Sequence, residues 1–502
     1  MKRFILGALV ASLVALPLVA CGKNSVANAG EELKVLSKED LKANSSEGKP
    51  IEVVFWHSFG DNIEKQLDPI IASFEADMAK EGIYIDVNAE SVGGGYDGLR
   101  SRINMGIKSN SIPTMALGYP DHFANYIENG IMLPLDEFIA DDKVGFTEEE
   151  KADFIQSYWN ENIFTVDGKE SVVGIPFNKS SEVMYYNASA VDPILTELGY
   201  ISEEGYWEKP TWEQVWAVSA KIQEKMANGT LAYTFNGNEY KADSNAKYPV
   251  IVDSAANFFI TSTRQWGGEG YYTRLNAETG KGEVVLNNDV VRTAQNYFLS
   301  KCQQDLFQFP QKKGVNYGSN LMLNLQSFIS IGSTAGVKNN GSTKYELKVA
   351  PYPQKSYAEG DFQAVIQQGT NACILSKNSN NLTRTAAWLL IKYMTSTEKT
   401  AEFSMNTGYL PVRTSAVESD AYQAFLADYE NIFDGFVAQA VNAAYSQKAY
   451  FYTDPAFSGS STVRDKVDSA VVSIYTQDKP IQEAINGLYD ALKKLKITCV
   501  DL

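Results

Sequence analysis

Hydrophobic and polar positions follow two alternating periods along the first part of the chain. Residues 51–59 (IEVVFWHSF) form a nearly continuous apolar run, which is typical of a buried strand. Over residues 61–82, apolar side chains recur every three or four positions and predict a helix with one buried face. Strand-like runs at 83–92 and 113–119 flank a second helical pattern at 96–110. This β-α-β-α-β order predicts a parallel sheet covered by helices.

The pattern is less regular after residue 170. Two apolar runs, 172–178 and 182–187, flank a polar stretch and predict two short strands. Thr211 and Gln214 have the spacing of a capping box, which predicts that a helix begins there. Further predictions are a loop or hairpin at 228–249, strands at 327–333, 346–353 and 371–377, and a helix from Thr385 to about Asn406 that ends before Gly408.

The first 20 residues have the layout of an export signal. Lys2 and Arg3 precede an apolar run over residues 4–20, which is shorter than the roughly 20 residues that a spanning helix needs. The run ends in LVAC, which resembles the lipobox of bacterial lipoproteins and implies cleavage before Cys21 and lipidation of its thiol. A retained N-terminal helix is the alternative. Residues 21–49 are polar and predict a lipidated flexible tether, so we expect an extracytoplasmic body in the cell envelope, anchored at Cys21.

Composition narrows the classes of function that fit this chain. The 502 residues are 44% hydrophobic, which suffices for more than one domain. The formal charge is −17, and loss of Lys2 and Arg3 would make it −19. Such an acidic chain is a poor candidate for binding nucleic acid or anionic lipid surfaces. No second apolar run approaches the length of a membrane span.

Few residues are suited to metal or nucleophilic chemistry. Cys302, Cys373 and Cys499 remain besides the lipidated thiol, and their wide spacing is neither a disulfide framework nor a zinc site, although one pair could form. His57 and His122 are the only histidines, so the HExxH pattern is excluded. We expect His57 to make a hydrogen bond near a strand end and His122 to lie on the surface. No GxSxG, Walker A or EF-hand spacing occurs. The sequence therefore predicts no metal, no cofactor and no enzyme.

Six ordered blocks carry a family likeness. Together they resemble the extracellular solute-binding proteins of bacterial ABC importers (family 1, carbohydrate type), most closely the glycerol-3-phosphate-binding branch. The blocks are FWHSFGDNIEKQLDPIIASFEA, SVGGGYDGLRSRI, GIPFNKSSEVMYYN, PTWEQVW, VAPYP and NTGYLPVR.

This resemblance implies an α/β fold with two lobes, the type II periplasmic-binding-protein fold, in which a hinge joins two mixed sheets flanked by helices. The solute would be clamped between the lobes. Mapped onto this chain, lobe one would comprise residues 50–172 plus 360–404. Lobe two would comprise residues 173–359 plus 405–502.

The resemblance also implies a set of residues that contact the solute. It places Tyr96 there, after three glycines that allow a tight turn, with packing on the next helix as the alternative. Ser180 matches a serine of the family motif, whereas Ser181 is more simply a turn residue. Ser333 is assigned a ligand-binding role, and an ordinary N-cap is the alternative.

Four more positions complete this set. A ligand-binding glutamate of the family falls on Pro120, so Asp121 is assigned its role, and this displacement leaves a sugar ligand open. Gln368 and Gly369 share one family glycine position, unless Gly369 merely opens a strand. Tyr409 is placed at the cleft, with a hydrophobic helix cap as the alternative.

Arg464 matches the family's ligand arginine. A guanidinium group suits phosphate or neighbouring hydroxyls. A surface ion pair with Asp465 or Asp468 is the alternative.

We therefore expect a monomeric, lipid-anchored receptor that delivers a glycerol-3-phosphate or carbohydrate-type solute to ABC transporter permease subunits by cleft closure. An oligosaccharide-specific binding protein of the same fold is the first alternative. An extracytoplasmic glycan hydrolase would need paired carboxylates that the sequence does not reveal. A surface adhesin or scaffold would show no cleft closure with a small molecule.

Overall fold

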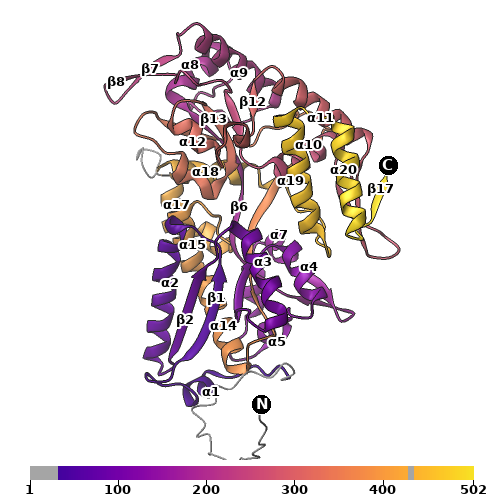
Figure 1. Cartoon of the computed structure of the whole chain (residues 1–502). Coiled ribbons are helices and arrows are strands. Elements are labelled where there is room, and N and C mark those ends of the chain that lie inside the picture. The colour runs from indigo at the N-terminus through magenta and orange to yellow at the C-terminus, as the bar shows by residue number, and fades with distance from the viewer. Residues whose placement is uncertain (1–31, 428–434) are drawn as a thin grey trace, which may run out of the picture.

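The apolar runs after residue 50 form a parallel sheet, as predicted. In the computed structural model, which describes residues 32–427 and 435–502, β1 (Ile51–His57) pairs in parallel with β2 (Ile85–Ser91) and with β3 (Met115–Gly118). These strands form the lower lobe in Figure 1. Its other elements are α2 (Asp61–Lys80), α3 (Gly95–Ser109), α4 (Pro120–Glu128), α5 (Asp136–Ala140), α6 (Glu148–Asp153), α7 (Gln156–Asn160), β4 (Ile163–Val166) and β5 (Lys169–Val172).

The predicted tether is wrong from residue 32 onward. Helix α1 (Lys38–Ala43) begins with a capping box between Ser37 and Asp40. Its Leu41 is fully buried in the lower core. The Lys34 amide also donates to the side chain of Asn381 at 3.2 Å. A few apolar side chains thus dock this polar segment onto the lobe. The predicted signal peptide and Cys21 lie outside the described residues.

One long strand replaces the two short strands predicted around residues 179–181. Strand β6 (Ile175–Asn187) is buried along all 13 residues. Its polar centre does not interrupt it, because the side chains find partners: Lys179 pairs with Glu161, and the Ser181 hydroxyl donates to the Ile366 carbonyl at 2.9 Å. These interactions offset the free-energy cost of burying the polar side chains of the strand.

Strand β6 connects the two lobes. Its first half pairs antiparallel with β15 (Val365–Ile374), which in turn pairs antiparallel with β3. Its second half pairs antiparallel with β13 (Ile329–Ser333) and β14 (Leu347–Pro351). A ten-stranded sheet therefore runs through both lobes, and it also includes β9 (Val250–Val252), β12 (Phe307–Gln308) and β16 (Phe451–Tyr452). Eight of its strands follow the order β12-β9-β13-β6-β15-β3-β1-β2, while β14 pairs with β6 and β16 pairs with β15. The mixed sheets agree with the predicted two-lobe α/β fold.

The upper lobe in Figure 1 contains the elements between these two crossing strands. The capping box of Thr211 and Gln214 begins α9, and a hairpin of β7 and β8 occupies the predicted insertion, so both predictions are confirmed. The elements are α8 (Ala188–Leu198), α9 (Trp212–Ala227), β7 (Ala232–Phe235), β8 (Asn238–Lys241), β9 (Val250–Val252), α10 (Ala255–Gly267), β10 (Thr273–Leu275), β11 (Gly282–Asn287), α11 (Asp289–Cys302), β12 (Phe307–Gln308), α12 (Gly318–Leu323) and α13 (Val337–Asn340).

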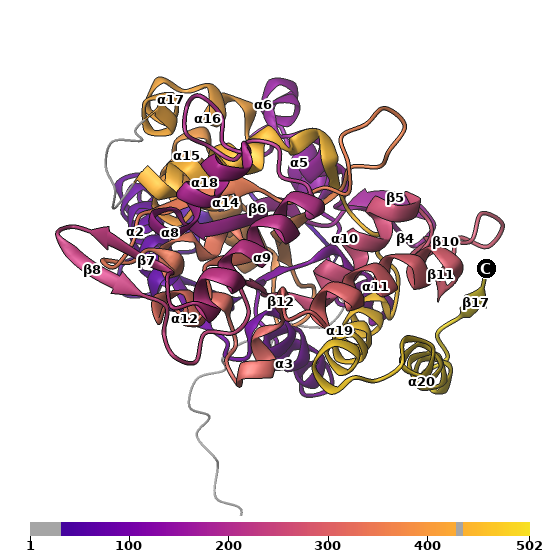
Figure 2. The same ribbon diagram turned by 90° about the horizontal axis from the view of Figure 1, so that it is seen from above.

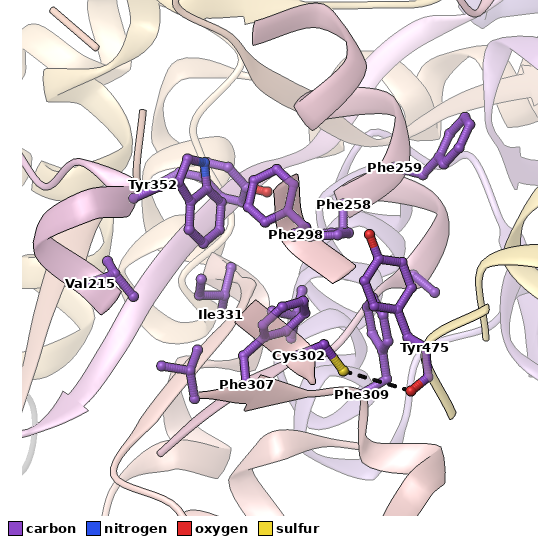
Figure 3. Packing of buried hydrophobic residues seen from close by; sticks show 14 of the residues in the cluster. Val215, Phe258, Phe259, Phe298, Cys302, Phe307, Phe309, Ile331, Tyr352 and Tyr475 are labelled. Atoms are coloured by element: carbon purple, nitrogen blue, oxygen red, sulfur yellow. Dashed lines mark hydrogen bonds between the residues drawn. The ribbon is translucent and has the colours of Figure 1, made fainter. Parts of the chain in front are cut away.

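Aromatic rings form the core of the upper lobe. Figure 3 shows Phe258, Phe298, Phe307 and Tyr475 converging from separate helices and strands. The rings of Phe258 and Phe298 meet edge to face with centroids 4.7 Å apart, a favourable geometry for aromatic pairs. Cys302 lies beside them as a free thiol, and Cys373 and Cys499 are also free, so the cysteine pair that the sequence left open does not form.

The chain after β15 returns to the lower lobe and then to the upper one. The helix expected from Thr385 to Asn406 is two helices, because Ser396 caps a new helix by accepting from the Lys399 amide. Gly408 ends the second helix with φ of 81°, as expected. Figure 2 shows α19 and α20 on the side of the molecule away from β7 and β8. The bounds are α14 (Asn381–Met394), α15 (Thr397–Thr407), α16 (Thr414–Glu418), α17 (Asp420–Ala427), α18 (Gly435–Ser446), β16 (Phe451–Tyr452), α19 (Ser460–Gln477), α20 (Ile481–Lys494) and β17 (Cys499–Asp501).

The crossing strands contribute to both cores. Phe177 of β6 packs in the lower core, and Met184 of the same strand packs in the upper core. The residue boundaries assigned to the two lobes stay a prediction. Within residues 32–427 and 435–502, no helix combines the length and apolarity that crossing a bilayer requires.

Candidate functional site

A cavity of about 670 Å³ lies where the strands of the two lobes meet. Its wall draws on the start of α3, the start of α4, both crossing strands, β13, α10 and α19. All eight residues that the resemblance assigned to solute contact line this one cavity. They are Tyr96, Asp121, Ser180, Ser333, Gln368, Gly369, Tyr409 and Arg464.

Tyr96 belongs to a cluster of tyrosines at the cavity wall. Gly94 has φ of 85°, which lets the chain turn sharply into α3 and present Tyr96 on the second helical residue. The Tyr96 hydroxyl accepts from Asn178 Nδ2 at 3.0 Å and lies 3.4 Å from the Tyr409 hydroxyl. The ring of Tyr119 meets that of Tyr96 edge to face at 5.1 Å. Flat rings with hydroxyl groups at one wall suit a solute that has both apolar faces and polar edges.

Tyr409 fits both interpretations of its position. Its ring is buried and stacks on Phe403 with centroids 5.8 Å apart, as a hydrophobic cap would. Its hydroxyl nevertheless faces that of Tyr96 at the cavity wall.

The crossing strands contribute a polar patch at the base of the cavity. Ser180 of β6 lies opposite Gln368 of β15, and both line the cavity. Gly369 lies inside β15 with φ of 97°, so it does not open the strand. A Cβ atom at Gly369 would lie 2.0 Å from the Asn178 carbonyl oxygen. Only glycine lets the two backbones approach this closely.

Arg464 on α19 does not form the ion pairs that the surface alternative requires. Asp465 pairs with Arg100 at 2.7 Å, and Asp468 accepts from the Ala256 amide at 3.1 Å. Within the described residues, Arg464 has no carboxylate at ion-pair distance. Burial disfavours its charge, but four nearby groups, Tyr272, Asp121, Asp454 and Tyr119, together outweigh this and raise the pKa of the guanidinium. Arg464 therefore places a charged guanidinium at the cavity wall, with no ion-pair partner among the described residues.

Asp121 and His122 occupy the first turn of α4. The Asp121 side chain is 20% exposed and lines the cavity. The prediction that His122 lies on the surface is wrong: the residue is 3% exposed, and its Nε2 lies 3.8 Å from Asp121 Oδ1. Burial lowers the pKa of His122. His57 behaves as expected, because its Nδ1 accepts from the Phe59 amide at 3.2 Å where β1 ends.

Ser333 combines the two roles considered for it. Its hydroxyl accepts from the Ala335 amide at 3.3 Å as a helix cap, and the residue lines the cavity. The preceding Gly332 leaves room for Asp253, since a Cβ there would lie 2.5 Å from Asp253 Oδ2.

Sequence reasoning missed two acidic residues on the upper wall, the buried Glu182 and the half-buried Asp253, together with the buried amide of Asn257. Burial raises the pKa of Glu182 to about 7, and it raises that of Asp253 to about 7 as well. The side chains of a strand alternate, so Ser180 in the cavity already implied Glu182 two positions later. Asp253 follows β9 at the carboxyl end of a parallel strand, where ligands of α/β sheets bind.

This arrangement suits noncovalent capture of a small polar molecule. Hydroxyls, amides, carboxylates and one guanidinium surround a space that can replace the hydration shell of a solute. Among the described residues, no group of histidine, cysteine and carboxylate side chains is arranged to hold a metal ion.

Comparisons with known proteins give the family. The model of the family described as bacterial extracellular solute-binding protein matches residues 70–430. The sn-glycerol-3-phosphate-binding periplasmic protein UgpB of Yersinia pestis bv. Antiqua is 22% identical over 446 residues, which cover 87% of this chain and 90% of that protein. UgpB of Salmonella typhimurium is 20% identical over 442 residues, covering 87% of this chain and 91% of its own length.

Solved structures show the same fold. UgpB from Mycobacterium tuberculosis, in complex with glycerophosphocholine, superposes with a TM-score of 0.66 at 18% identity and covers 88% of this chain and 97% of its own. The GacH receptor of Streptomyces glaucescens, studied with acarbose, gives a TM-score of 0.64 at 16% identity and covers 89% and 98%. Fold and family model agree, and the chain belongs to the bacterial extracellular solute-binding proteins.

Proposed function

We propose that this chain is a lipid-anchored receptor that captures a glycerophosphate or carbohydrate-type solute and delivers it to the permease of an ABC importer by closing its two lobes. The observation that carries this proposal is the convergence of all eight assigned residues on one cavity between the lobes. The family is one of binding proteins rather than enzymes. Relatives named for sn-glycerol-3-phosphate binding, and a structural neighbour studied with acarbose, support the two solute classes.

The chemistry of the cavity explains how capture would proceed. Lobe closure removes water from the solute, so fixed partners must replace each lost hydrogen bond. The polar edges of the solute can form hydrogen bonds with Ser180, Gln368 and the tyrosine hydroxyls. Arg464 can donate to a phosphate or to a pair of hydroxyls. No covalent step is needed. The anchor at Cys21 would keep the receptor near its permease.

A thermal-shift screen tests the proposal. Residues 22–502, which retain the whole described body, would be screened at millimolar concentration against glycerol-3-phosphate, glycerophosphodiesters and mono- to trisaccharides. A thousandfold excess over Kd stabilises a protein by about 4 kcal/mol, so we expect a clear shift with at least one class. No shift with any member would contradict the proposal.

Arg464→Ala then separates the two solute classes. If the solute is phosphorylated, we expect this change to abolish its binding, because the guanidinium is the only Lys or Arg side chain lining the cavity in the described part of the chain. Lys466→Ala is the matched control, since Lys466 is exposed on the same helix. Near-normal affinity of Arg464→Ala in a calorimetric titration would remove Arg464 from the site.

A further inference from the structure

The cavity wall has more negative than positive charge after its ion pairs are counted. Four of its carboxylates have a Lys or Arg within ion-pair distance, namely Asp97, Glu161, Asp454 and Asp465. The other four have none among the described residues. Those four are Asp121, Glu182, Asp253 and Asp468. Against them the wall offers the single guanidinium of Arg464.

Glu182 is the most deeply buried of these four carboxylates. The residue is 1% exposed, and it projects from β6 toward α10. Its Oε1 accepts from Asn257 Nδ2 at 2.7 Å, whereas its Oε2 is buried and has no hydrogen-bond partner in the described residues. A buried carboxylate oxygen without a donor costs free energy, and the chain retains one at the wall of its cavity.

Asn257 presents a second acceptor at the same place. The residue is 2% exposed, and Ser254 fixes its backbone by capping α10. Its side-chain amide donates to Glu182, which leaves Asn257 Oδ1 buried and without a partner among the described residues. Two acceptor oxygens from adjacent side chains therefore lack donors. Both oxygens lie just beneath the surface of the cavity wall, so a solute group that reaches them can satisfy them with N–H or O–H donors.

We infer that Glu182 and Asn257 form a subsite for a protonated amine carried by the solute, so that the solute has a cationic end. This inference rests on the proposed function and specifies the solute. An ammonium group supplies up to three donors and the opposite charge, which a hydroxyl does not. Arg464 would then serve an anionic or hydroxylated end of the same molecule. Burial raises the pKa of Glu182 to about 7, although the hydrogen bond from Asn257 and the charge of Arg464 oppose this rise.

Matched ligand pairs test this subsite by titration calorimetry at pH 7.5. The first pair is glycerophosphoethanolamine and the glycerophosphate diester of ethylene glycol, and the second is fully deacetylated chitobiose and cellobiose. In the first pair one amine replaces one hydroxyl on the same framework, and in the second an amine replaces the 2-hydroxyl of each ring. We expect the amine member of the binding pair to bind at least about tenfold more tightly, since one charge-assisted contact accounts for such a factor.

Two variants assign the preference to Glu182. Glu182→Gln keeps the shape of the side chain and should bring the two members of the pair within about threefold of each other. Glu208→Gln, an exposed position on the same lobe, should leave the preference unchanged.

The outcomes separate this inference from the proposed function. Equal binding of the two members, or binding of only the hydroxyl member, would overturn the amine subsite while the solute receptor stands. A preference that survives Glu182→Gln would also overturn it. If no glycerophosphate or carbohydrate binds at all, the receptor proposal fails and the subsite falls with it.

Discussion

At the scale of single residues, the buried carboxylate of Glu182 predicts a pH dependence of stability. The unfolded chain releases this proton near pH 4.5, whereas burial holds it in the folded state to about pH 7. Between these values the native state binds more protons, so the contribution of Glu182 to the free energy of unfolding falls as the pH rises. Asp253 lies close enough to raise this pKa further, while Asn257 and Arg464 oppose the shift.

Glu182→Gln should remove this pH-dependent contribution to the free energy of unfolding. We expect the ligand-free variant to match the parent chain near pH 4.5 and to exceed it by up to about 3 kcal/mol at pH 8. Urea unfolding of both chains at the two pH values measures the difference. Glu208→Gln should show no such divergence. A variant that is equally destabilised at both pH values would mean that Glu182 is paired in the folded chain.

The residue scale also shows where sequence reasoning ended. The eight positions assigned from the resemblance line one cavity, although Asp121 was assigned beside the family position at Pro120 and Gln368 and Gly369 shared one position. Glu182 was missed because the polar residues 179–181 were predicted to separate two short strands, so its alternation with Ser180 was not considered. Once they are read as one strand, the alternation of side chains places Ser180 and Glu182 on the same face. The burial of His122 could not be predicted, since it depends on how α4 packs against the rest of the chain.

At the scale of elements, the close approach of β6 and β15 depends on Gly369. Its φ of 97° and the 2.0 Å that would separate its Cβ from the Asn178 carbonyl oxygen exclude any side chain without movement of the strands. Gly369→Ala should lower the free energy of unfolding by at least about 3 kcal/mol, from backbone strain of about 1–2 kcal/mol plus displacement of the strands. Urea unfolding gives this value.

Gly360→Ala is the matched control. Gly360 has a similar φ of 87°, but nothing lies within 4 Å of its Cβ position. The control should therefore cost only the backbone term. Equal losses for the two variants would show that the contact between β6 and β15 is not what requires glycine.

Elements were predicted best where one face is apolar and a cap is visible in the sequence. Helix α9 met both conditions, and its start at Thr211 and Gln214 was correct. Helix α1 was not predicted, because it has no apolar face beyond the single buried residue Leu41. Residues 385–406 were predicted as one helix, because the cap at Ser396 lies inside a continuous periodic run and could not be recognised. Tertiary contacts decide such cases, and a period alone does not reveal them.

At the scale of the whole molecule, side chains link the two lobes across the mouth of the cavity. Arg100 on α3 of the lower lobe pairs with Asp465 on α19 of the upper lobe, with Nη2 and Oδ2 2.7 Å apart. Nearby, the Ser458 hydroxyl donates to Glu128 of α4. The Arg100 side chain is 11% exposed, so water screens this pair less than a surface pair. These contacts exist only while the lobes are together, so they favour the closed arrangement.

Arg100→Gln should therefore shift the population of the ligand-free chain toward an open arrangement. Arg100 does not line the cavity, but its partners Asp97 and Asp465 do, so a loss of solute affinity would combine weaker closure with a changed charge at the wall, and the scattering measurement reports closure by itself. A contact worth about 1 kcal/mol in the closed state weakens binding by up to about fivefold. We expect this loss by titration, together with a larger radius of gyration of the ligand-free chain by small-angle X-ray scattering.

Arg102→Gln provides the comparison that makes this decisive. Arg102 lies two residues further along α3 and pairs with Glu90 of β2 at 2.5 Å, within the lower lobe. The same substitution there removes the same charge without touching the other lobe. If both variants lose affinity and expand alike, the effect belongs to the charge of α3. If only Arg100→Gln does so, the pair across the cavity mouth sets how readily the receptor closes.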